Sequence, residues 1–421
     1  MRSLEQWLQH LESIHPSEID LGLERIRKVA LKLDLLKPAE HVIVVAGTNG
    51  KGTTVTTCAQ ILQCSGRKVG VFTSPHIHHY NERVAINGEV VSDELLIKSF
   101  EVVDAARGDI TLTYFEVSAL SAFYIFKQQN VDAAVLEIGL GGRLDAVNVV
   151  EPDVSVVTSI GLDHTDWLGD TLDKIGYEKA GVYRKNKPAI CGQVNPPNGL
   201  IDHAKQLGAQ LLVKGEAFSY DSSHINDTGQ WSWQGQDTNG NAIQLEHLPK
   251  PKLPLENVAT ALQTLMSLNI DISQQALKQG IETAYIGGRL EPIDKPFKGL
   301  MDVGHNQQAA QFLSQQLPPI KGRCFAVLAM LADKDPLAVV NALNQQVDTW
   351  YFAGLDGYRG QSGQALAAKL AQTKVESNIF DSVAQALDAV VLEADENDFV
   401  LIFGSFFTVA QAQAWLENNN G

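Results

Sequence analysis

The chain has 421 residues, of which 44% are hydrophobic and 19% are charged; the length predicts about two to three domains, and the hydrophobic content favours a sizeable core over a disordered chain. Asp and Glu outnumber Lys and Arg by 49 to 33, and the formal net charge of −16 argues against nucleic acid or an anionic membrane surface as a partner. The four cysteines form no CxxC pair and no apolar run approaches the roughly 18 residues of a membrane span, so a cytoplasmic protein is expected.

The N-terminal segment places Leu4, Trp7, Leu8 and Leu11 on one helical face, which predicts an amphipathic helix and not a signal peptide. Short runs rich in Val and Ile then alternate with segments of helical length. Because these runs are apolar at successive positions, they predict strands of parallel sheets built from βαβ units, and hence an α/β fold with two sheets. Five runs lie in the first half (41–47, 67–74, 132–139, 153–160, 188–192) and four in the second (299–304, 324–331, 349–354, 399–405).

Between the two sets of strands, residues 215–248 are polar, with Trp231 and Trp233 alternating and an Asn-Gly turn at 239–240. This pattern predicts a short hairpin insertion. A helix is expected from about Asn257 to Leu268. The following Gly287-Gly288 pair is typical of a hinge, so we predict two domains, residues 1–286 and 287–421.

The strongest local signal is GTNGKGTT (47–54), which lies between a predicted strand and a predicted helix. Glycines let backbone N–H groups approach phosphate oxygens, and a helix N-terminus adds a favourable dipole. Lys51 has the charge to neutralise the β- and γ-phosphates of a nucleotide, and the Thr53 hydroxyl suits magnesium. The spacing departs from the usual P-loop, because only two residues separate Gly47 from Gly50 and because Gly52 follows the lysine.

Three further strand ends carry polar side chains. Ser74 ends one run, Glu137 lies near the end of the next, and Asp163 and His164 follow the run at 153–160. Ligands of open parallel sheets bind beyond the carboxyl ends of the strands. A hydroxyl, a carboxylate and an imidazole there suggest a magnesium shell beside a triphosphate.

These segments together resemble one family. GTNGKGTT, TSPHIHHYNERV (73–84), LEIGLGGRLDAVN (136–148), SIGLDHTDWLG (159–169) and EKAG (178–181) are similar to the bifunctional dihydrofolate synthase/folylpolyglutamate synthases of the Mur ligase superfamily. The resemblance implies a P-loop ATPase and pterin-binding domain with a mainly parallel sheet over residues 1–286. A smaller Rossmann-like ligase domain over residues 287–421 is expected to follow it.

The resemblance also implies an activity. ATP converts a carboxylate of dihydropteroate or of tetrahydrofolate and its polyglutamates into an acyl phosphate, and the amine of L-glutamate attacks it to form an amide. A monofunctional folylpolyglutamate synthase is the alternative. A cell-wall Mur ligase is disfavoured because only 46 residues precede Gly47, and a GTPase-like switch because the string Asn186-Lys187-Pro188-Ala189 lacks the aspartate of a guanine motif. The expected partners include neither nucleic acid nor a membrane, and a monomer is expected.

Motif by motif, the resemblance assigns roles to individual residues. The magnesium ions, two in number, are assigned to Ser74, Glu137 and His164. Lys179 matches a carbamylated lysine and, with Lys51 and His164, is assigned to catalysis. Nucleotide binding falls to Gly47, Thr48, Asn49, Gly50, Lys51, Gly52, Thr53, Asn257, Arg289, Asp302 and His305. Binding of the pterin-containing substrate falls to Ile19, Asp20, Leu21, Thr113, Tyr114, Phe115, Glu116, Leu144, Asp145 and Ala146.

Overall fold

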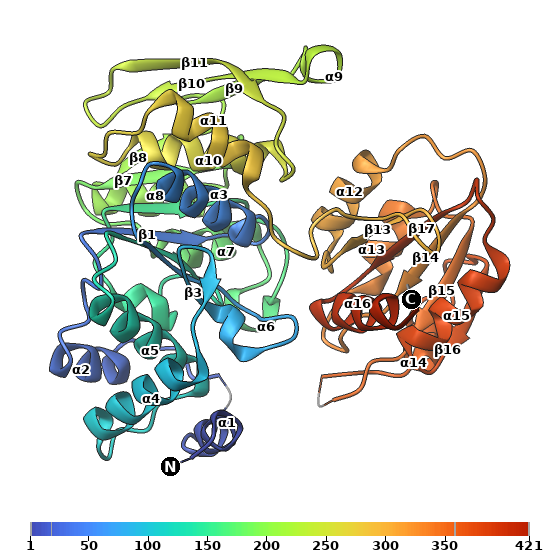
Figure 1. Cartoon of the computed structure of the whole chain (residues 1–421), viewed down its shortest axis with the longest axis horizontal. Helices are drawn as coiled ribbons and strands as arrows, with labels where there is room; N and C mark the ends of the chain where they lie inside the picture. The colour runs from blue at the N-terminus through green and yellow to red at the C-terminus, as the bar shows by residue number, and fades with distance from the viewer. Residues whose placement is uncertain (1, 18, 358, 420–421) are drawn as a thin grey trace. The chain divides into compact units, whose positions relative to one another are not determined.

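The computed structural model describes residues 2–17, 19–357 and 359–419. Contacts divide the chain into two compact units, one ending at Ile286 and the other beginning at Gly287 (Figure 1). Each unit has its own sheet and its own hydrophobic core.

The larger unit is built on an eight-stranded sheet of order β4-β3-β2-β5-β1-β6-β7-β8. Six neighbouring strands, β2, β5, β1, β6, β7 and β8, pair in parallel. β3 and β4 add an antiparallel edge beside β2. β1 is buried on both faces, with Val42 and Val44 in one core cluster and Ile43 and Val45 in the other, which explains its continuous apolar sequence. The strands are β1 (His41–Ala46), β2 (Val69–Phe72), β3 (Val84–Ile86), β4 (Glu89–Val90), β5 (Ala133–Glu137), β6 (Val154–Val157), β7 (Pro188–Cys191) and β8 (Gln210–Val213).

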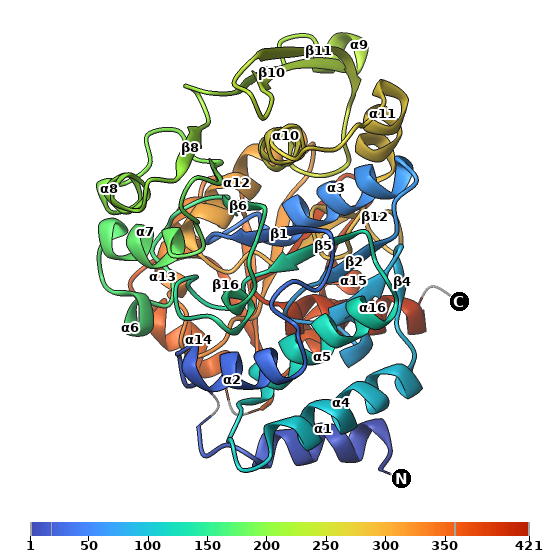
Figure 2. The ribbon, with the colours of Figure 1, turned by 90° about the vertical axis from the view of Figure 1, so that its left-hand side faces the viewer.

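Helices cover both faces of this sheet (Figure 2). One face packs on α1 (Leu4–Ser13), α2 (Glu24–Lys32), α4 (Asp93–Arg107), α5 (Tyr114–Gln128), α7 (Leu172–Ala180) and α8 (Asn198–Leu207). The other packs on α3 (Lys51–Cys64), α10 (Leu255–Met266) and α11 (Gln274–Thr283). The predicted N-terminal helix is confirmed as α1, which buries Trp7 and Leu11. Four single-turn helices lie in the connections: η1 (Tyr80–Arg83), η2 (Ala146–Val149), α6 (Thr165–Leu168) and α9 (Ile225–Thr228).

The polar insertion forms a separate antiparallel sheet of order β11-β10-β9, made of β9 (Ser219–Asp221), β10 (Gln230–Gln236) and β11 (Ala242–Pro249). The predicted hairpin is correct for β10 and β11 but incomplete, because β9 adds a third strand. Trp231 and Trp233 are both buried, and the indole N–H of Trp233 donates to the carbonyl oxygen of Ala259 in α10 at 3.0 Å. The insertion is therefore packed on the helical layer.

The smaller unit contains a six-stranded sheet of order β12-β13-β17-β14-β15-β16, in which only β12 is antiparallel to its neighbour. Separate core clusters cover its two faces. Its strands are β12 (Glu291–Ile293), β13 (Gly299–Asp302), β14 (Cys324–Leu328), β15 (Thr349–Ala353), β16 (Ser377–Phe380) and β17 (Phe399–Phe403). Its helices are α12 (Gln307–Gln316), α13 (Pro336–Leu343), α14 (Gly363–Lys369), α15 (Val383–Glu393) and α16 (Phe406–Asn419).

All nine predicted strands form, and the α/β class with mainly parallel sheets is confirmed. The expected five and four strands are too few, since the two sheets contain eight and six. The missed members β3, β4, β8, β12 and β16 have two to four residues each and lie toward sheet edges, where sequences are not continuously apolar.

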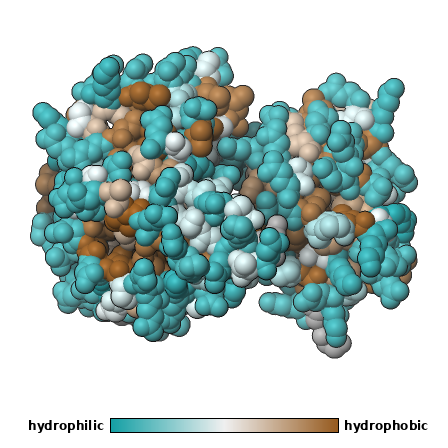
Figure 3. Space-filling model, turned by 90° about the horizontal axis from the view of Figure 1, so that it is seen from above, coloured by the Kyte–Doolittle hydropathy of each residue, from teal (hydrophilic) through white to brown (hydrophobic). Residues whose placement is uncertain are grey.

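Among the described residues, no helix combines the length and the apolar character that crossing a membrane requires. Figure 3 shows that hydrophilic side chains cover much of the surface in view, with hydrophobic side chains gathered in patches among them.

Candidate active site

The site begins at the loop that joins β1 to α3. Gly50 caps α3 with a φ of +85°, a left-handed conformation that favours glycine. The helix begins at Lys51, so the positive end of its dipole lies at the loop. The Lys51 side chain folds back over the loop, and its Nζ donates to the carbonyl oxygens of Gly47 at 3.2 Å and Thr48 at 3.3 Å. A nucleotide phosphate at this loop would meet both the lysine and the helix N-terminus.

Neighbouring segments hold the loop in place. The amides of Thr48 and Asn49 donate to the carbonyl and hydroxyl oxygens of Ser159 at 2.8 and 3.0 Å. From α10, the Asn257 side-chain amide donates to the Thr53 hydroxyl at 2.7 Å. The structure thus places Asn257 directly against the phosphate loop.

Two of the three predicted metal ligands lie together. Glu137 ends β5 and is only 6% exposed, and its carboxylate accepts the Ser74 amide at 3.2 Å. Glu137 also lies beside the first turn of α3, because a Cβ on Gly52 would be 3.9 Å from its Oε2. Within the described ranges, no three His, Cys, Asp or Glu side chains converge as a metal site. Ser74 and Glu137 offer a hydroxyl and a carboxylate, which are oxygen donors that suit a hard cation such as Mg²⁺.

The third predicted ligand, His164, precedes the single-turn helix α6 with a φ of +51°. Its amide donates to the Asp163 carboxylate at 2.9 Å, and its Nε2 lies 3.9 Å from the same oxygen. The sequence motif gave no role to Asp163, yet its charge acts on both His164 and the buried Lys179.

Lys179, near the end of α7, is 4% exposed, and its Nζ donates to the carbonyl oxygen of Gly47 at 3.0 Å. Burial and then the positive charge of Lys51 lower the pKa of Lys179 to about 7, against the opposing effects of Asp163 and Asp145. A lysine with this pKa is substantially neutral near physiological pH and is a competent nucleophile.

Asp145 is 2% exposed and precedes the turn η2. Its carboxylate accepts the amides of Leu140 at 2.8 Å and Val147 at 2.9 Å, and burial raises its pKa to about 7 despite those bonds. Ala146 follows it and is also buried, and the carbonyl oxygen of Leu144 accepts the amide of Gly22 at 3.2 Å. The predicted segments around 19–21 and 144–146 therefore adjoin.

The predicted substrate residues at the start of α5 separate into two environments. The ring of Phe115 packs on Phe72, with centroids 5.9 Å apart, and over Gly139. Tyr114 instead meets Tyr80 edge-on and lines a cavity of about 520 Å³ between α1 and the segment from His76 to Asn81. Phe115 therefore lies close to the strand ends, whereas Tyr114 belongs to a different surface.

The histidines of the 76–79 segment have local partners. Arg83 Nε donates to His76 Nδ1 at 2.9 Å, and the Glu82 carboxylate accepts the amides of Ile77, His78 and His79 at 2.6 to 2.7 Å. Burial, followed by the charge of Arg83, lowers the pKa of His76 to about 4. These contacts order the turn that follows Ser74.

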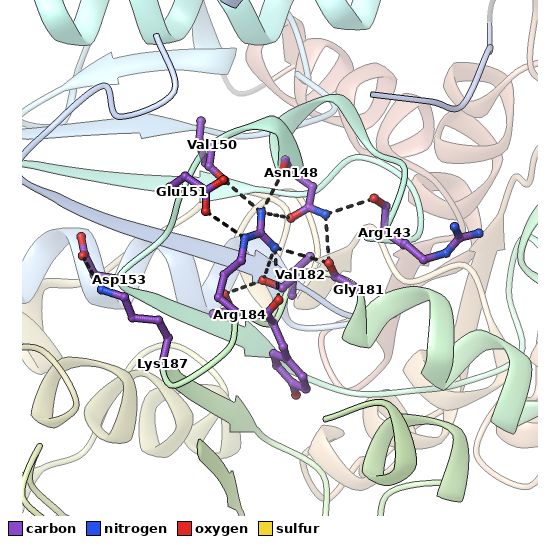
Figure 4. Close-up of polar contacts among 11 residues, drawn as sticks. Arg143, Asn148, Val150, Glu151, Asp153, Gly181, Val182, Arg184 and Lys187 are labelled. Atoms are coloured by element: carbon purple, nitrogen blue, oxygen red, sulfur yellow. Dashed lines mark hydrogen bonds and ion pairs between the residues drawn. The ribbon is translucent and has the colours of Figure 1, made fainter. Parts of the chain in front are cut away.

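A polar network centred on Arg184, which lies outside the motifs of the sequence analysis, connects two of these segments (Figure 4). The Arg184 guanidinium donates to the carbonyl oxygens of Asn148, Val150 and Val182 at 2.9 to 3.0 Å. The Asn148 side-chain amide in turn donates to the carbonyl oxygens of Arg143 and Gly181. Arg184 thus fixes the Asp145 turn to the end of the helix that carries Lys179.

In the smaller unit, Asp302 organises two loops. Its carboxylate accepts the amides of Leu290 at 3.0 Å and Gly304 at 2.7 Å. Burial raises the pKa of Asp302, and the nearby Arg289 opposes the shift. The guanidinium of Arg289 lies over the Phe406 ring at 5.1 Å, and His305 Nδ1 contacts the carbonyl oxygen of Val303. These three predicted residues are close neighbours.

Two family models match the chain: the Mur ligase middle domain over residues 45–224 and the Mur ligase glutamate ligase domain over residues 288–406. The dihydrofolate synthase/folylpolyglutamate synthase of Escherichia coli (strain K12) is 45% identical over 409 residues, which cover 97% of this chain and 94% of that protein. The protein of the same name from Haemophilus influenzae is 42% identical, and the aligned residues cover 98% of each.

Solved structures agree with these matches. E. coli FolC in complex with DHPP and ADP matches with a TM-score of 0.94 at 44% identity, over 100% of this chain and 99% of that one. A bifunctional folylpolyglutamate synthase/dihydrofolate synthase with Mn, AMPPNP and L-glutamate bound gives a TM-score of 0.91 at 44% identity, over 99% and 98%. The predicted resemblance is confirmed, and the bifunctional enzyme is favoured over the monofunctional alternative. The chain belongs to the dihydrofolate synthase/folylpolyglutamate synthase family of the Mur ligases.

Proposed function

We propose that this chain is an ATP-dependent amide ligase that adds L-glutamate to dihydropteroate and to tetrahydrofolates. The observation that carries the proposal is the phosphate loop itself, with Lys51 folded over it and the buried Glu137 beside the first turn of α3. The names of the relatives support both reactions.

The reaction balances in two steps. A substrate carboxylate oxygen bonds to the γ-phosphorus of ATP as the bond from that phosphorus to the β,γ-bridging oxygen breaks, which yields ADP and an acyl phosphate. The glutamate nitrogen then attacks the acyl carbon and loses a proton, and the carbon–oxygen bond to phosphate breaks. We assign to Lys51 and the N-terminus of α3 the stabilisation of charge on the transferred phosphoryl group.

We further propose that Ser74 and Glu137 hold Mg²⁺, which supplies charge neutralisation for the triphosphate when it is bound. The support is that the bond from the Ser74 amide to the Glu137 carboxylate brings together two residues that carry oxygen donors of the kind Mg²⁺ prefers. A relative has been solved with Mn bound. The role of His164 and a second ion stay predictions, as do the nucleotide contacts of Arg289, Asp302 and His305.

Lys179 is proposed to be carbamylated. Its neutral amine nitrogen bonds to the carbon of CO₂ and releases one proton, which leaves an anionic carbamate. The burial of Lys179 and its pKa of about 7 support this assignment, because only the neutral amine reacts. A carbamate oxygen would add a negatively charged metal ligand beside Gly47.

The deciding experiment incubates the protein with ATP, Mg²⁺ and L-glutamate, first with dihydropteroate and then with tetrahydrofolate. Product masses larger by one glutamyl residue are expected in both incubations. Absence of dihydrofolate from the first would leave a folylpolyglutamate synthase only, and ATP turnover that ignores both acceptors would contradict a ligase.

Two further assignments accompany the proposal. All four cysteines are free thiols, as expected for an enzyme of the cytoplasm. The monomeric state stays a prediction, and light scattering on the purified protein tests it.

A further inference from the structure

Arg25, in the first turn of α2, joins the carboxylate of Asp20 to that of Glu116, which lies 91 positions after Arg25 in the chain. One guanidinium nitrogen lies 2.7 Å from the Asp20 carboxylate. The other donates to the Asp20 carbonyl oxygen at 2.8 Å and lies 3.3 Å from the Glu116 carboxylate. Both carboxylates belong to the residues predicted to bind the pterin-containing substrate, whereas Arg25 was given no role by the sequence analysis.

The Glu116 carboxylate has a structural task. Its second oxygen accepts the Thr113 amide at 2.7 Å, and the Thr113 hydroxyl accepts the Glu116 amide at 3.2 Å, which is a complete capping box for α5. The Glu116 side chain is only 4% exposed. Burial raises its pKa, and the Thr113 amide and Arg25 oppose that shift. Without Arg25, an ionised Glu116 would be a buried charge without a countercharge, which is costly.

The segment that leads into α2 has little regular structure of its own. Residues 19–22 form neither helix nor strand. Besides Arg25, two polar contacts hold this segment: the Gly22 amide donates to the carbonyl oxygen of Leu144 at 3.2 Å, and the His15 ring lies 3.3 Å from the Asp20 carboxylate. Arg25 therefore supplies the cross-link from this segment to the N-terminus of α5, where Phe115 lies.

We propose that Arg25 is a positioning residue for the dihydropteroate pocket. It fixes Asp20 and its neighbours Ile19 and Leu21 to the capped end of α5, so that the pocket is assembled before the substrate binds. Asp20 and Glu116 then act through Arg25 and not as direct ligands of the pterin ring. This inference rests on the proposed use of dihydropteroate.

The test compares Arg25→Gln and Arg25→Lys with Arg27→Gln, a change of the same type at an exposed position on the same helix. Because small displacements of binding groups are costly, Arg25→Gln is expected to raise the KM for dihydropteroate about tenfold. The KM for ATP is expected to change by less than about twofold, since the phosphate loop is untouched. Arg25→Lys should restore only part of the loss, because an ammonium cannot contact both carboxylates as a planar fork does. Arg27→Gln should match the wild type.

A second variant, Glu116→Gln, covers the case in which Arg25→Gln fails to fold. Glutamine keeps an acceptor for the Thr113 amide and removes only the charge that Arg25 contacts. It should raise the KM for dihydropteroate to a similar extent, and the double variant Arg25→Gln/Glu116→Gln should be no worse than the poorer single variant. Additive losses would mean that Glu116 binds the substrate directly, and would overturn the proposal.

The remaining outcomes are also decisive. An unchanged KM for dihydropteroate in Arg25→Gln, or an equal loss for dihydropteroate and ATP, overturns the positioning role. The wild-type chain is assayed in parallel. If it makes no dihydrofolate, the proposed function fails; an active wild type with an indifferent Arg25→Gln variant refutes the Arg25 proposal alone.

Discussion

The Nζ atom of Lys179 lies 3.0 Å from the carbonyl oxygen of Gly47, the first residue of the phosphate loop. Lys51 Nζ approaches the same oxygen to 3.2 Å, so two lysines from different helices share one acceptor. Their mutual repulsion adds to burial in lowering the pKa of Lys179. When Lys179 loses its proton, one of the two positive charges is removed, and the neutral amine can still donate a hydrogen bond to the carbonyl oxygen of Gly47.

We therefore expect the carbamylation of Lys179 to depend on pH. With a pKa of about 7, the amine is mostly protonated at about pH 6 and mostly neutral at about pH 8. At a fixed concentration of dissolved ¹³CO₂, the carbamate signal in the ¹³C NMR spectrum should therefore grow as the pH rises across this interval. Lys179→Met should abolish the signal, and Lys174→Met, at an exposed position of the same helix, should retain it. A signal that survives Lys179→Met would assign the modification elsewhere.

Replacing Lys51 should remove both activities, because one phosphate loop serves both acceptors. For Lys51→Ala we expect a loss of at least about a hundredfold in kcat with either dihydropteroate or tetrahydrofolate, since the loop loses its charged donor to the phosphates. Glutamate-dependent release of ADP measures both rates. Lys205→Ala, at an exposed position of α8, is the control. Retention of either activity by Lys51→Ala would contradict a shared loop.

Gly50 and Gly66 form a matched pair, because both have a φ of +85° and only Gly50 is crowded. An alanine methyl at Gly50 would lie 2.4 Å from Asn257 Oδ1, whereas nothing lies within 4 Å at Gly66. Both substitutions should cost about 1–2 kcal/mol of backbone strain. Gly50→Ala should also displace Asn257 from Thr53 and weaken ATP binding about tenfold or more. Calorimetric titration with an ATP analogue separates the two effects, and equal affinities in the two variants would refute the role of Asn257.

Asp145→Ala should impair dihydropteroate use more than ATP binding. The carboxylate is buried between the amides of Leu140 and Val147, so its removal also leaves two donors unpaired, at a cost of about 1–3 kcal/mol in the free energy of unfolding. Steady-state kinetics should show a higher KM for dihydropteroate with a similar KM for ATP. An equal rise in the KM for dihydropteroate and the KM for ATP would mean that Asp145 does not belong to the substrate pocket.

Arg184→Met should destabilise the larger unit by about 3 kcal/mol or more, because the variant leaves buried carbonyl oxygens without their donor. Lys185→Met, at the next and exposed position, should change the free energy of unfolding by less than about 0.5 kcal/mol. Urea unfolding followed by tryptophan fluorescence compares the two. Similar stabilities of the two variants would show that the network in Figure 4 contributes little.

The sequence was sufficient to predict the strands and helices whose hydrophobic pattern reflects how they are buried. The continuous apolar run of β1 predicted a strand covered on both faces, and both faces are covered. β4 and β16 were missed, because the two residues of Glu89–Val90 and the exposed edge Ser377–Phe380 have no apolar pattern. The strand-end rule placed Ser74 and Glu137 at one edge, where they meet.

Other parts of the site depend on burial and long-range contacts, which a single sequence does not contain. Without the family resemblance, Lys179 would be interpreted as an ordinary lysine on a helix, and its burial against Gly47 and lowered pKa are known only from the structure. Arg25 and Arg184 each contact a residue distant in the chain, Glu116 and Asn148 respectively, and neither arginine was assigned a role by the sequence analysis. The residues that neighbour such an arginine in the sequence do not indicate which distant loops it cross-links.

The packing of the polar insertion limits where this protein can be altered. Trp233 and Gln263 attach β10 to α10, and the same helix carries Asn257 to the Thr53 hydroxyl. Deleting β9 to β11 would therefore loosen α10, the helix that contacts the phosphate loop through Asn257. These strands lie more than 160 positions from Thr53 in the sequence. A label or a fused domain is better placed at the exposed tip of the hairpin, Asn239-Gly240, where the bracing is left intact.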